Sequence, residues 1–241
     1  MLRRLHEKLP RHDIVFFADQ LHVPYGDRST DELVELLRVN VAFLDERGAD
    51  AIVMACNTSC ATASQRGWPR SRAAIVDLIE SAAIAVESAG YERVGVIATA
   101  ATAATGAYTK KIAARVPGVR VTEVAAPALV PLVEAGKLEG DEPRAAVAAV
   151  CAQLPRELDA VILACTHYPL LDAHFAAVLG DGIARIDPAI VQAERAAAIS
   201  ATEGFAPGTG SIACITSGDP ERFRSAVTAT LGDLPEISFE R

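Results

Sequence analysis

A seven-residue pattern occurs twice in the 241-residue sequence, at residues 50–56 and again at residues 159–165. The first copy is Asp-Ala-Ile-Val-Met-Ala-Cys and the second is Asp-Ala-Val-Ile-Leu-Ala-Cys. Each copy places three large aliphatic side chains in a row, and such a short apolar run is typical of a strand buried inside a parallel sheet. We therefore expect two equivalent strands that belong to two related halves of the chain.

Strands and helices are predicted to alternate along the rest of the chain. Apolar runs predict further strands at residues 13–19, 93–99, 119–124, 182–187 and 211–216. Helical spacing and capping residues predict helices at residues 2–9, 30–47, 107–116, 141–154, 191–203 and 220–231. Ser29 and Glu32 fit a capping box at the start of the second helix, and Asp141 is expected to cap the fourth. This alternation predicts an α/β fold with parallel sheets covered by helices.

Composition limits the classes of partner. The net charge of −8 argues against nucleic acid and against an anionic membrane surface. No apolar run approaches the roughly 18 residues that a membrane-spanning helix needs. The first residues lack the continuous apolar core of a secretory signal, and the five cysteines form no evident disulfide framework. We therefore expect a cytoplasmic protein with reduced thiols.

Each repeated strand ends in a cysteine that short polar side chains follow. Cys56 precedes Asn57 and Thr58, and Cys165 precedes Thr166 and a histidine. Ligands bind at the carboxyl ends of strands in open α/β sheets. A single cysteine at a strand end is more often a small buried apolar residue, but two in matching contexts indicate a shared role. A thiol that faces a helix N-terminus is expected to have a pKa below its reference value of about 8.5. Two such thiols on opposite sides of a substrate suit removal and return of a proton.

Other candidate residues are weaker. Cys151 and Cys214 are expected in the core, and Cys60 is spaced to share a helix face with Cys56. We expect no metal site, because too few ligands cluster in the sequence. Lys110 and Lys111 are expected to be solvated. The Gly-Thr-Gly at residues 208–210 precedes a strand instead of following one, so it is not a dinucleotide-binding fingerprint.

The two cysteine motifs resemble those of the glutamate racemases. The matching segments are Ala-Cys-Asn-Thr at residues 55–58 and Ala-Cys-Thr-His-Tyr-Pro at residues 164–169. Val-Pro-Tyr-Gly at residues 23–26 and Thr-Ser-Gly-Asp-Pro-Glu-Arg-Phe at residues 216–223 match as well. The resemblance covers the chain from residue 2 onward. Related aspartate racemases typically carry Glu where His167 stands, so the resemblance favours glutamate as substrate.

The resemblance implies two pseudo-symmetric parallel-sheet α/β domains with the active site in the cleft between them. We expect the first domain to comprise residues 1–80 with 190–241 and the second to comprise residues 81–189. It also implies a racemase without a cofactor that supplies D-glutamate for peptidoglycan and forms a homodimer. The implied catalytic residues are Cys56, Cys165, His167 and Glu134. The implied substrate-binding residues are Tyr25, Gly26, Asn57, Thr58, Thr102 and Thr166.

One family motif has no counterpart in this sequence. The racemases that it resembles begin with a strand followed by Asp-Ser-Gly-Val-Gly-Gly-Leu, and this sequence begins at the helix that comes next. The resemblance implies that the Asp of that motif assists the first cysteine and that its Ser contacts substrate. Cys56 is therefore expected to lack a partner, for which Asp19 is a candidate substitute.

Two other classes of function stay open from the sequence. The first is a different isomerase, or a hydrolase with one cysteine as nucleophile, from the wider racemase superfamily. The second is a catalytically impaired homologue that binds an amino acid or a partner protein. A strict requirement for both cysteines during inversion would argue against the first of these alternatives.

Overall fold

A computed structural model describes residues 1–231 and 237–240. The chain divides into two compact units. The first comprises Met1–Val53, Pro69–Val76 and Ala193–Arg241, and the second comprises Met54–Trp68 and Asp77–Gln192. The domain boundaries expected from the sequence stay a prediction. In the part of the chain that the structure describes, no helix is both long and apolar enough to cross a membrane.

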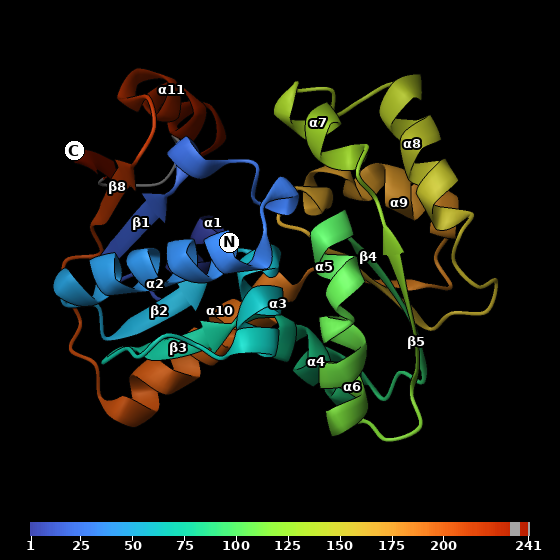
Figure 1. Cartoon of the computed structure of the whole chain (residues 1–241), viewed down its shortest axis with the longest axis horizontal. Coiled ribbons are helices and arrows are strands. Elements are labelled where there is room, and N and C mark those ends of the chain that lie inside the picture. The colour runs from blue at the N-terminus through green and yellow to red at the C-terminus, as the bar shows by residue number, and fades with distance from the viewer. Residues whose placement is uncertain (232–236, 241) are drawn as a thin grey trace. The chain divides into compact units, whose positions relative to one another are not determined.

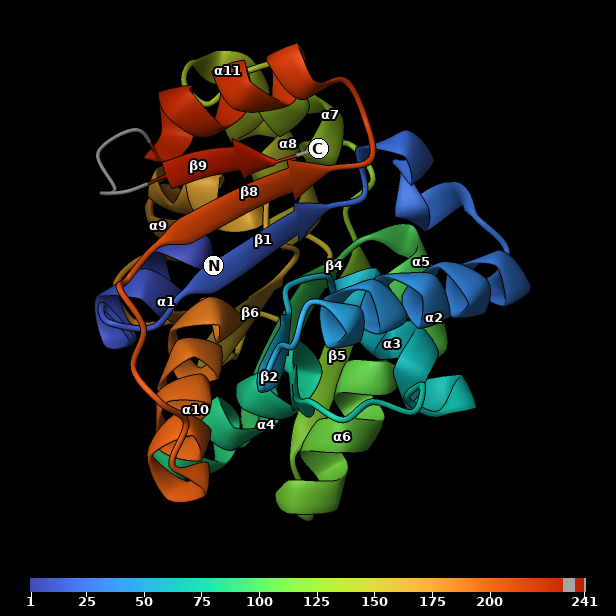
Figure 2. The ribbon, with the colours of Figure 1, turned by 90° about the vertical axis from the view of Figure 1, so that its left-hand side faces the viewer.

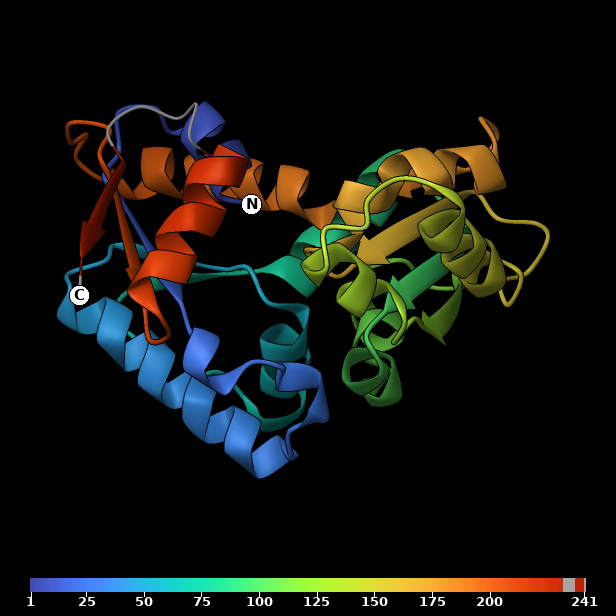
Figure 3. The ribbon, with the colours of Figure 1, turned by 90° about the horizontal axis from the view of Figure 1, so that it is seen from above.

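The first unit contains a parallel three-stranded sheet with the order β1–β8–β9. Its strands are β1 (Ile14–Ala18), β8 (Ile212–Thr216) and β9 (Ile237–Glu240). Strands β1 and β8 lie side by side in Figures 2 and 3, although they come from opposite ends of the chain. The sequence predicted the first two strands. It did not predict β9, because four residues are too few to establish a period.

Helices complete the first unit around an apolar core. They include α1 (Leu2–Lys8), α2 (Thr30–Glu46) and α11 (Pro220–Leu231), together with the short turns η1 (Gln20–His22) and η2 (Tyr25–Asp27). The predicted capping box at the start of α2 is confirmed, with both Ser29 and Glu32 hydrogen bonds present. Leu33, Leu37 and Val41 are buried at four-residue intervals along α2, which is the inward face of an amphipathic helix.

The second unit is built on a parallel four-stranded sheet with the order β5–β4–β6–β7. Its strands are β4 (Arg93–Ala98), β5 (Arg120–Ala125), β6 (Ala160–Ala164) and β7 (Ala184–Ile186). All of β6 is buried, so the second copy of the repeat is the buried parallel strand that the sequence predicted. The first copy forms β2 (Ala51–Met54), which pairs with β3 (Ala74–Asp77).

The aspartate that begins each copy of the repeat makes an equivalent main-chain hydrogen bond. The carbonyl of Asp50 accepts from Ala74 N at 2.9 Å, and the carbonyl of Asp159 accepts from Ala184 N at 3.0 Å. In each copy the aspartate thus begins the pairing with the next strand. The Asp159 carboxylate also accepts bonds from the Arg93 side chain and from main-chain N–H groups, and these lower its pKa to about 2.

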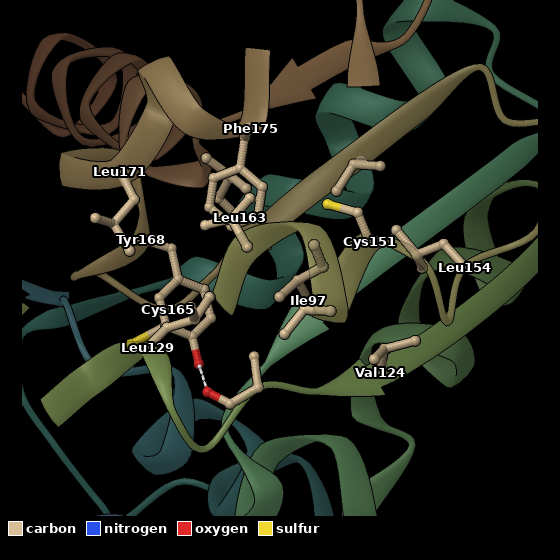
Figure 4. Close-up of a cluster of buried hydrophobic side chains, with 14 of the residues drawn as sticks. Ile97, Val124, Leu129, Cys151, Leu154, Leu163, Cys165, Tyr168, Leu171 and Phe175 are labelled. Atoms are coloured by element: carbon tan, nitrogen blue, oxygen red, sulfur yellow. Dashed lines mark hydrogen bonds between the residues drawn. The ribbon is translucent and has the colours of Figure 1, made fainter. Parts of the chain in front are cut away.

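Helices surround the sheet of the second unit (Figure 1). They are α3 (Asn57–Arg66), α4 (Leu78–Ala89), α5 (Ala100–Thr105), α6 (Ala107–Arg115), α7 (Leu129–Glu134), α8 (Asp141–Cys151), η3 (Tyr168–Leu171), α9 (Asp172–Leu179) and the start of α10 (Pro188–Glu203). Side chains from α8, α9 and η3 pack with Ile97, Leu163 and Cys165 in one apolar cluster (Figure 4). This cluster fixes β6, the strand that Cys165 follows.

One local prediction was wrong, and one short helix was missed. Gly140, not Asp141, is the N-cap of α8, and Asp141 is the first helical residue; the φ of +97° at position 140 explains why a glycine stands there. Helix α5 was not predicted, because its six residues are all Ala and Thr. Thr99 caps its start and the left-handed Gly106 ends it.

Candidate active site

Both repeated cysteines belong to the second unit. Cys165 directly follows the fully buried β6, whereas Cys56 comes after β2, in which only Ile52 is buried, so the expected burial was wrong for the first copy. Cys56 is the N-cap of α3, and its carbonyl accepts the amide of Cys60 at 3.0 Å. Cys165 follows β6, and its carbonyl accepts the amide of Tyr168 at 3.0 Å. Each thiol therefore stands at a strand-to-helix turn, where the sequence placed it. A charge on Cys56 contributes to the pKa of Cys165, so the two thiols lie within electrostatic reach.

The Cys165 thiol is a weaker acid than the sequence suggested. Burial raises its pKa to about 11. The main-chain N–H groups of His167 and Tyr168 act in the opposite direction, while charges on Cys56 and Glu134 raise it further. The expected lowering of the pKa by a helix N-terminus was wrong here, because loss of water around a thiolate outweighs two N–H dipoles. Cys165 is consequently a thiol, not a thiolate, at neutral pH.

His167 joins Cys165 to a carboxylate. Its Nδ1 lies 3.6 Å from Cys165 Sγ, and its Nε2 lies 2.5 Å from Glu134 Oε1. Glu134 is the last residue of α7, and its side chain is 62% exposed. With the Nε2 proton donated to the carboxylate, a neutral imidazole presents Nδ1 to the thiol as an acceptor. The structure thus brings three of the four predicted catalytic residues into one hydrogen-bonded row.

Predicted substrate-binding hydroxyls gather at the same edge of the sheet. Thr102 is fully buried, and its Oγ1 lies 3.4 Å from Thr58 Oγ1. Thr99 caps α5 and donates to Thr102 at 3.0 Å. Because Ala98 of β4 pairs with Ala164 of β6, Thr99 and Cys165 follow the ends of neighbouring strands. Thr166 is exposed between Cys165 and His167.

Asn57 directly follows Cys56 and is 5% exposed. Its Oδ1 accepts a hydrogen bond from the hydroxyl of Tyr108 at 2.5 Å. The sequence did not single out Tyr108, because 51 residues separate it from Asn57 and no pattern links them. The sequence offered one hint of this contact: Tyr108 is one of four tyrosines and lies on the apolar face of a predicted helix.

Tyr25 and Gly26 belong to the first unit, after the cis peptide between Val23 and Pro24. The Tyr25 hydroxyl donates to Asp19 Oδ2 at 2.6 Å and accepts from Asn40 Nδ2 at 2.9 Å. Their contact with substrate stays a prediction.

Asp19, the candidate to replace the missing partner of Cys56, is hydrogen-bonded to residues of the first unit. Its carboxylate also accepts bonds from His22 Nδ1 and Ser217 Oγ, each at 2.7 Å. Burial alone would raise the pKa of Asp19, but hydrogen bonds from Tyr25, Ser217 and His22 outweigh that effect and lower it. Asp19 is therefore an ionised carboxylate at neutral pH.

The other three cysteines are buried, and all five are free thiols. Cys151 and Cys214 lie in apolar clusters, as predicted. Cys60 is fully buried, with Sγ 3.6 Å from the carbonyl of Met54, so it does not share an accessible face with Cys56. Among the described residues, no group of three or more His, Cys, Asp or Glu side chains is placed to hold a metal ion.

The two lysines of α6 were expected to be solvated; Lys110 is exposed, as expected, whereas Lys111 is half-buried and paired. Lys111 Nζ lies 3.1 Å from Glu80 Oε2 and 4.0 Å from Asp77 Oδ2. Lys110 Nζ donates to the carbonyl of Thr105 at 3.0 Å.

Comparison with known proteins places this chain in a family. The sequence pattern of the family described as Asp/Glu/Hydantoin racemase matches residues 1–196. The chain belongs to this family. A glutamate racemase from Desulforudis audaxviator is 38% identical over 98% of this chain and 90% of the relative.

Solved structures of racemases share the fold. A glutamate racemase isoform from Bacillus anthracis superposes with a TM-score of 0.90 at 25% identity, over 100% of this chain and 92% of that one. The glutamate racemase from Thermus thermophilus, solved with β-chloro-D-alanine, gives a TM-score of 0.84 at 30% identity, over 99% of this chain and 91% of that one. The α/β fold predicted from the sequence is thus confirmed.

Proposed function

We propose that this family member interconverts L- and D-glutamate by proton transfer between two thiols, without a cofactor, and supplies D-glutamate for peptidoglycan. The observation that carries the proposal is the placement of Cys56 and Cys165. Each thiol follows one of the two copies of the repeated strand, both thiols belong to one unit, and they lie within electrostatic reach of each other. The relatives named glutamate racemase support glutamate as the substrate.

The reaction needs one base and one acid on opposite faces of the Cα atom. For one enantiomer, the Cys56 thiolate takes the Cα proton, and the Cys165 thiol returns a proton to the other face. For the other enantiomer the roles reverse, and Cys165 must first lose its own proton. His167 Nδ1 is the acceptor for that proton, since it lies 3.6 Å from Sγ. Each turnover leaves the number of protons on the enzyme unchanged.

The remaining predicted residues bind and orient the substrate. Asn57, Thr58, Thr102 and Thr166 hydrogen-bond its carboxylates and amine, while Tyr25 and Gly26 contact it through main-chain groups. Support comes from Asn57 and Thr58, which directly follow Cys56, and from Thr102, whose hydroxyl lies 3.4 Å from that of Thr58. A cytoplasmic homodimer is part of the same proposal, and light scattering on the purified protein would measure its mass.

Deuterium exchange tests the reaction directly. L-glutamate and D-glutamate are incubated separately with the protein in deuterated buffer, and Cα-proton loss and chirality are followed in parallel. We expect both enantiomers to exchange and to invert. Absence of exchange from either enantiomer would refute racemisation of glutamate. A thioester trapped between a cysteine and the substrate would instead favour a hydrolase with one cysteine as nucleophile.

A further inference from the structure

Tyr108 reaches from α6 to the residue that follows the first thiol. It is fully buried, and its hydroxyl lies 2.5 Å from Asn57 Oδ1. Asn57 is the first residue of α3 and is itself 5% exposed. A side-chain amide has one oxygen that accepts and one NH2 group that donates. With the oxygen engaged by Tyr108, the NH2 group is what Asn57 can offer to a ligand.

The direction of this hydrogen bond is determined by the surroundings of Tyr108. Burial, followed by the charges of Cys60 and Asp77, holds the pKa of the phenol well above its usual value. The hydroxyl therefore keeps its proton across the physiological pH range. A buried hydroxyl proton needs an acceptor, and Asn57 Oδ1 supplies it. Rotating the amide by half a turn would bring NH2 to the phenol and leave the phenol proton facing a donor.

We propose that Tyr108 is a positioning residue that orients the Asn57 amide so that its NH2 group, and not its oxygen, recognises the substrate. The proposal deepens the proposed function and rests on it. An amide NH2 group binds a carboxylate, whereas an amide oxygen would bind the ammonium group. Tyr108 therefore selects which charged group of the amino acid lies beside Asn57, next to the Cys56 thiol.

The substitution Asn57→Asp separates the two orientations. The new carboxylate would still accept from Tyr108, but its second oxygen would replace the donor. We expect the KM for glutamate to rise about 10- to 100-fold, since a charge-assisted bond is lost and like charges meet. A KM equal to that of the wild type would overturn the proposal, because it would mean that an acceptor serves at this position.

A double-mutant cycle tests the role of Tyr108. Tyr108→Phe removes only the hydroxyl, and we expect it to raise KM about 3- to 10-fold with a smaller change in kcat. In the Asn57→Ala background, the same substitution should leave KM unchanged. Equal effects in both backgrounds would show that the hydroxyl acts independently of Asn57. Ile112→Val, which also removes one buried group from α6, is the matched control for a loss of packing and should leave KM unchanged.

A spectroscopic measurement keeps this inference separate from the activity. Asn40 and Asn57 are the two asparagines of the sequence, so ¹⁵N-asparagine labelling gives two side-chain amide pairs in the NMR spectrum. Tyr108→Phe should shift the Asn57 pair and leave the Asn40 pair in place, whereas Tyr25→Phe should do the reverse. An unmoved Asn57 pair in Tyr108→Phe would overturn the positioning role. If the wild type did not racemise glutamate, the proposed function would fail. The NMR measurement would still show whether Tyr108 bonds to the Asn57 amide.

Discussion

His167 Nε2 lies 2.5 Å from Glu134 Oε1, which joins the end of α7 to the turn that follows β6. The carboxylate thereby directs the other ring nitrogen of His167 toward the second thiol. A base held in one tautomer by an acidic partner is a recurrent arrangement for activating a nucleophile or an acid.

We expect Glu134→Gln to slow Cα-proton exchange for one enantiomer of glutamate about tenfold and to change the other less. The amide keeps the shape of the carboxylate but loses the charge that stabilises protonated His167. Water replaces part of the effect, because Glu134 is well exposed. The measurement is the exchange rate of each enantiomer in deuterated buffer. Glu142→Gln, a 61% exposed carboxylate paired with Lys137, is the matched control; equal slowing of both enantiomers by Glu134→Gln would contradict this role.

We expect His167→Asn to impair proton removal from one enantiomer of glutamate more than from the other. Removing the acceptor at 3.6 Å from Cys165 Sγ hinders deprotonation of that thiol, whose pKa is about 11. We expect exchange of the enantiomer that uses Cys165 as base to fall about 10²- to 10³-fold. The Cys56 direction should fall less, and steady-state exchange of the two enantiomers compares the directions. Similar losses in both would mean that His167 does not act through Cys165.

Replacement of either thiol should abolish racemisation. In Cys56→Ser and Cys165→Ser, a hydroxyl of much higher pKa cannot serve as the base, and we expect losses of at least about 10³-fold. One-sided exchange from a single enantiomer is compatible with the mechanism, since the other thiol remains. Chiral chromatography of the products measures inversion. Near-wild-type racemisation by either variant would refute the two-thiol assignment.

Asp77 makes stability depend on pH. It is 7% exposed at the start of α4, and burial raises its pKa despite the bond from Ile79 N–H and the charge of Lys111. A raised carboxyl pKa means that the folded state binds the proton more tightly than the unfolded state. The contribution of Asp77 is therefore most favourable below the unfolded pKa of about 3.9, and is lost as pH rises through the folded pKa.

Asp77→Asn removes this dependence while an amide oxygen still caps α4. We expect the Tm of the variant, relative to the wild type, to increase between pH 4 and pH 7. A change of about 1 kcal/mol corresponds to about 2–4 °C in a protein of this size. Thermal unfolding of both proteins at several pH values measures the difference. A difference that stayed constant or decreased with pH would contradict the raised pKa.

Gly95 is closely packed in the middle of β4. A Cβ atom at this position would lie 3.0 Å from Leu154 Cδ2 and 3.1 Å from Leu158 Cδ1, both in the buried cluster. We expect Gly95→Ala to reduce the free energy of unfolding by about 1–3 kcal/mol. Denaturant unfolding provides the measurement. Gly182→Ala is the control, because no atom lies within 4 Å of a Cβ at that position. Equal stability of both variants would show that the leucines around Gly95 move aside without cost.

Local sequence patterns predicted most of the strands and helices, because the spacing of buried residues along one element can be read without knowing which elements pack against it. The repeat predicted β6 as a fully buried strand, and Ser29 with Glu32 predicted the start of α2. The misses include the short elements α5 and β9, whose six and four residues carry too little period. Gly140 was missed as a cap because its left-handed φ is a property of the folded backbone.

The sequence by itself determined that two thiols follow two copies of one strand pattern, because each strand and the turn after it are local. Only the tertiary structure decided what surrounds them. The pKa of Cys165 follows from how much water the folded unit excludes, and the partners of Asn57 and His167 come from residues 51 and 33 positions away. Desolvation and long-range hydrogen bonds depend on how distant segments pack, and no pattern within a single segment records them.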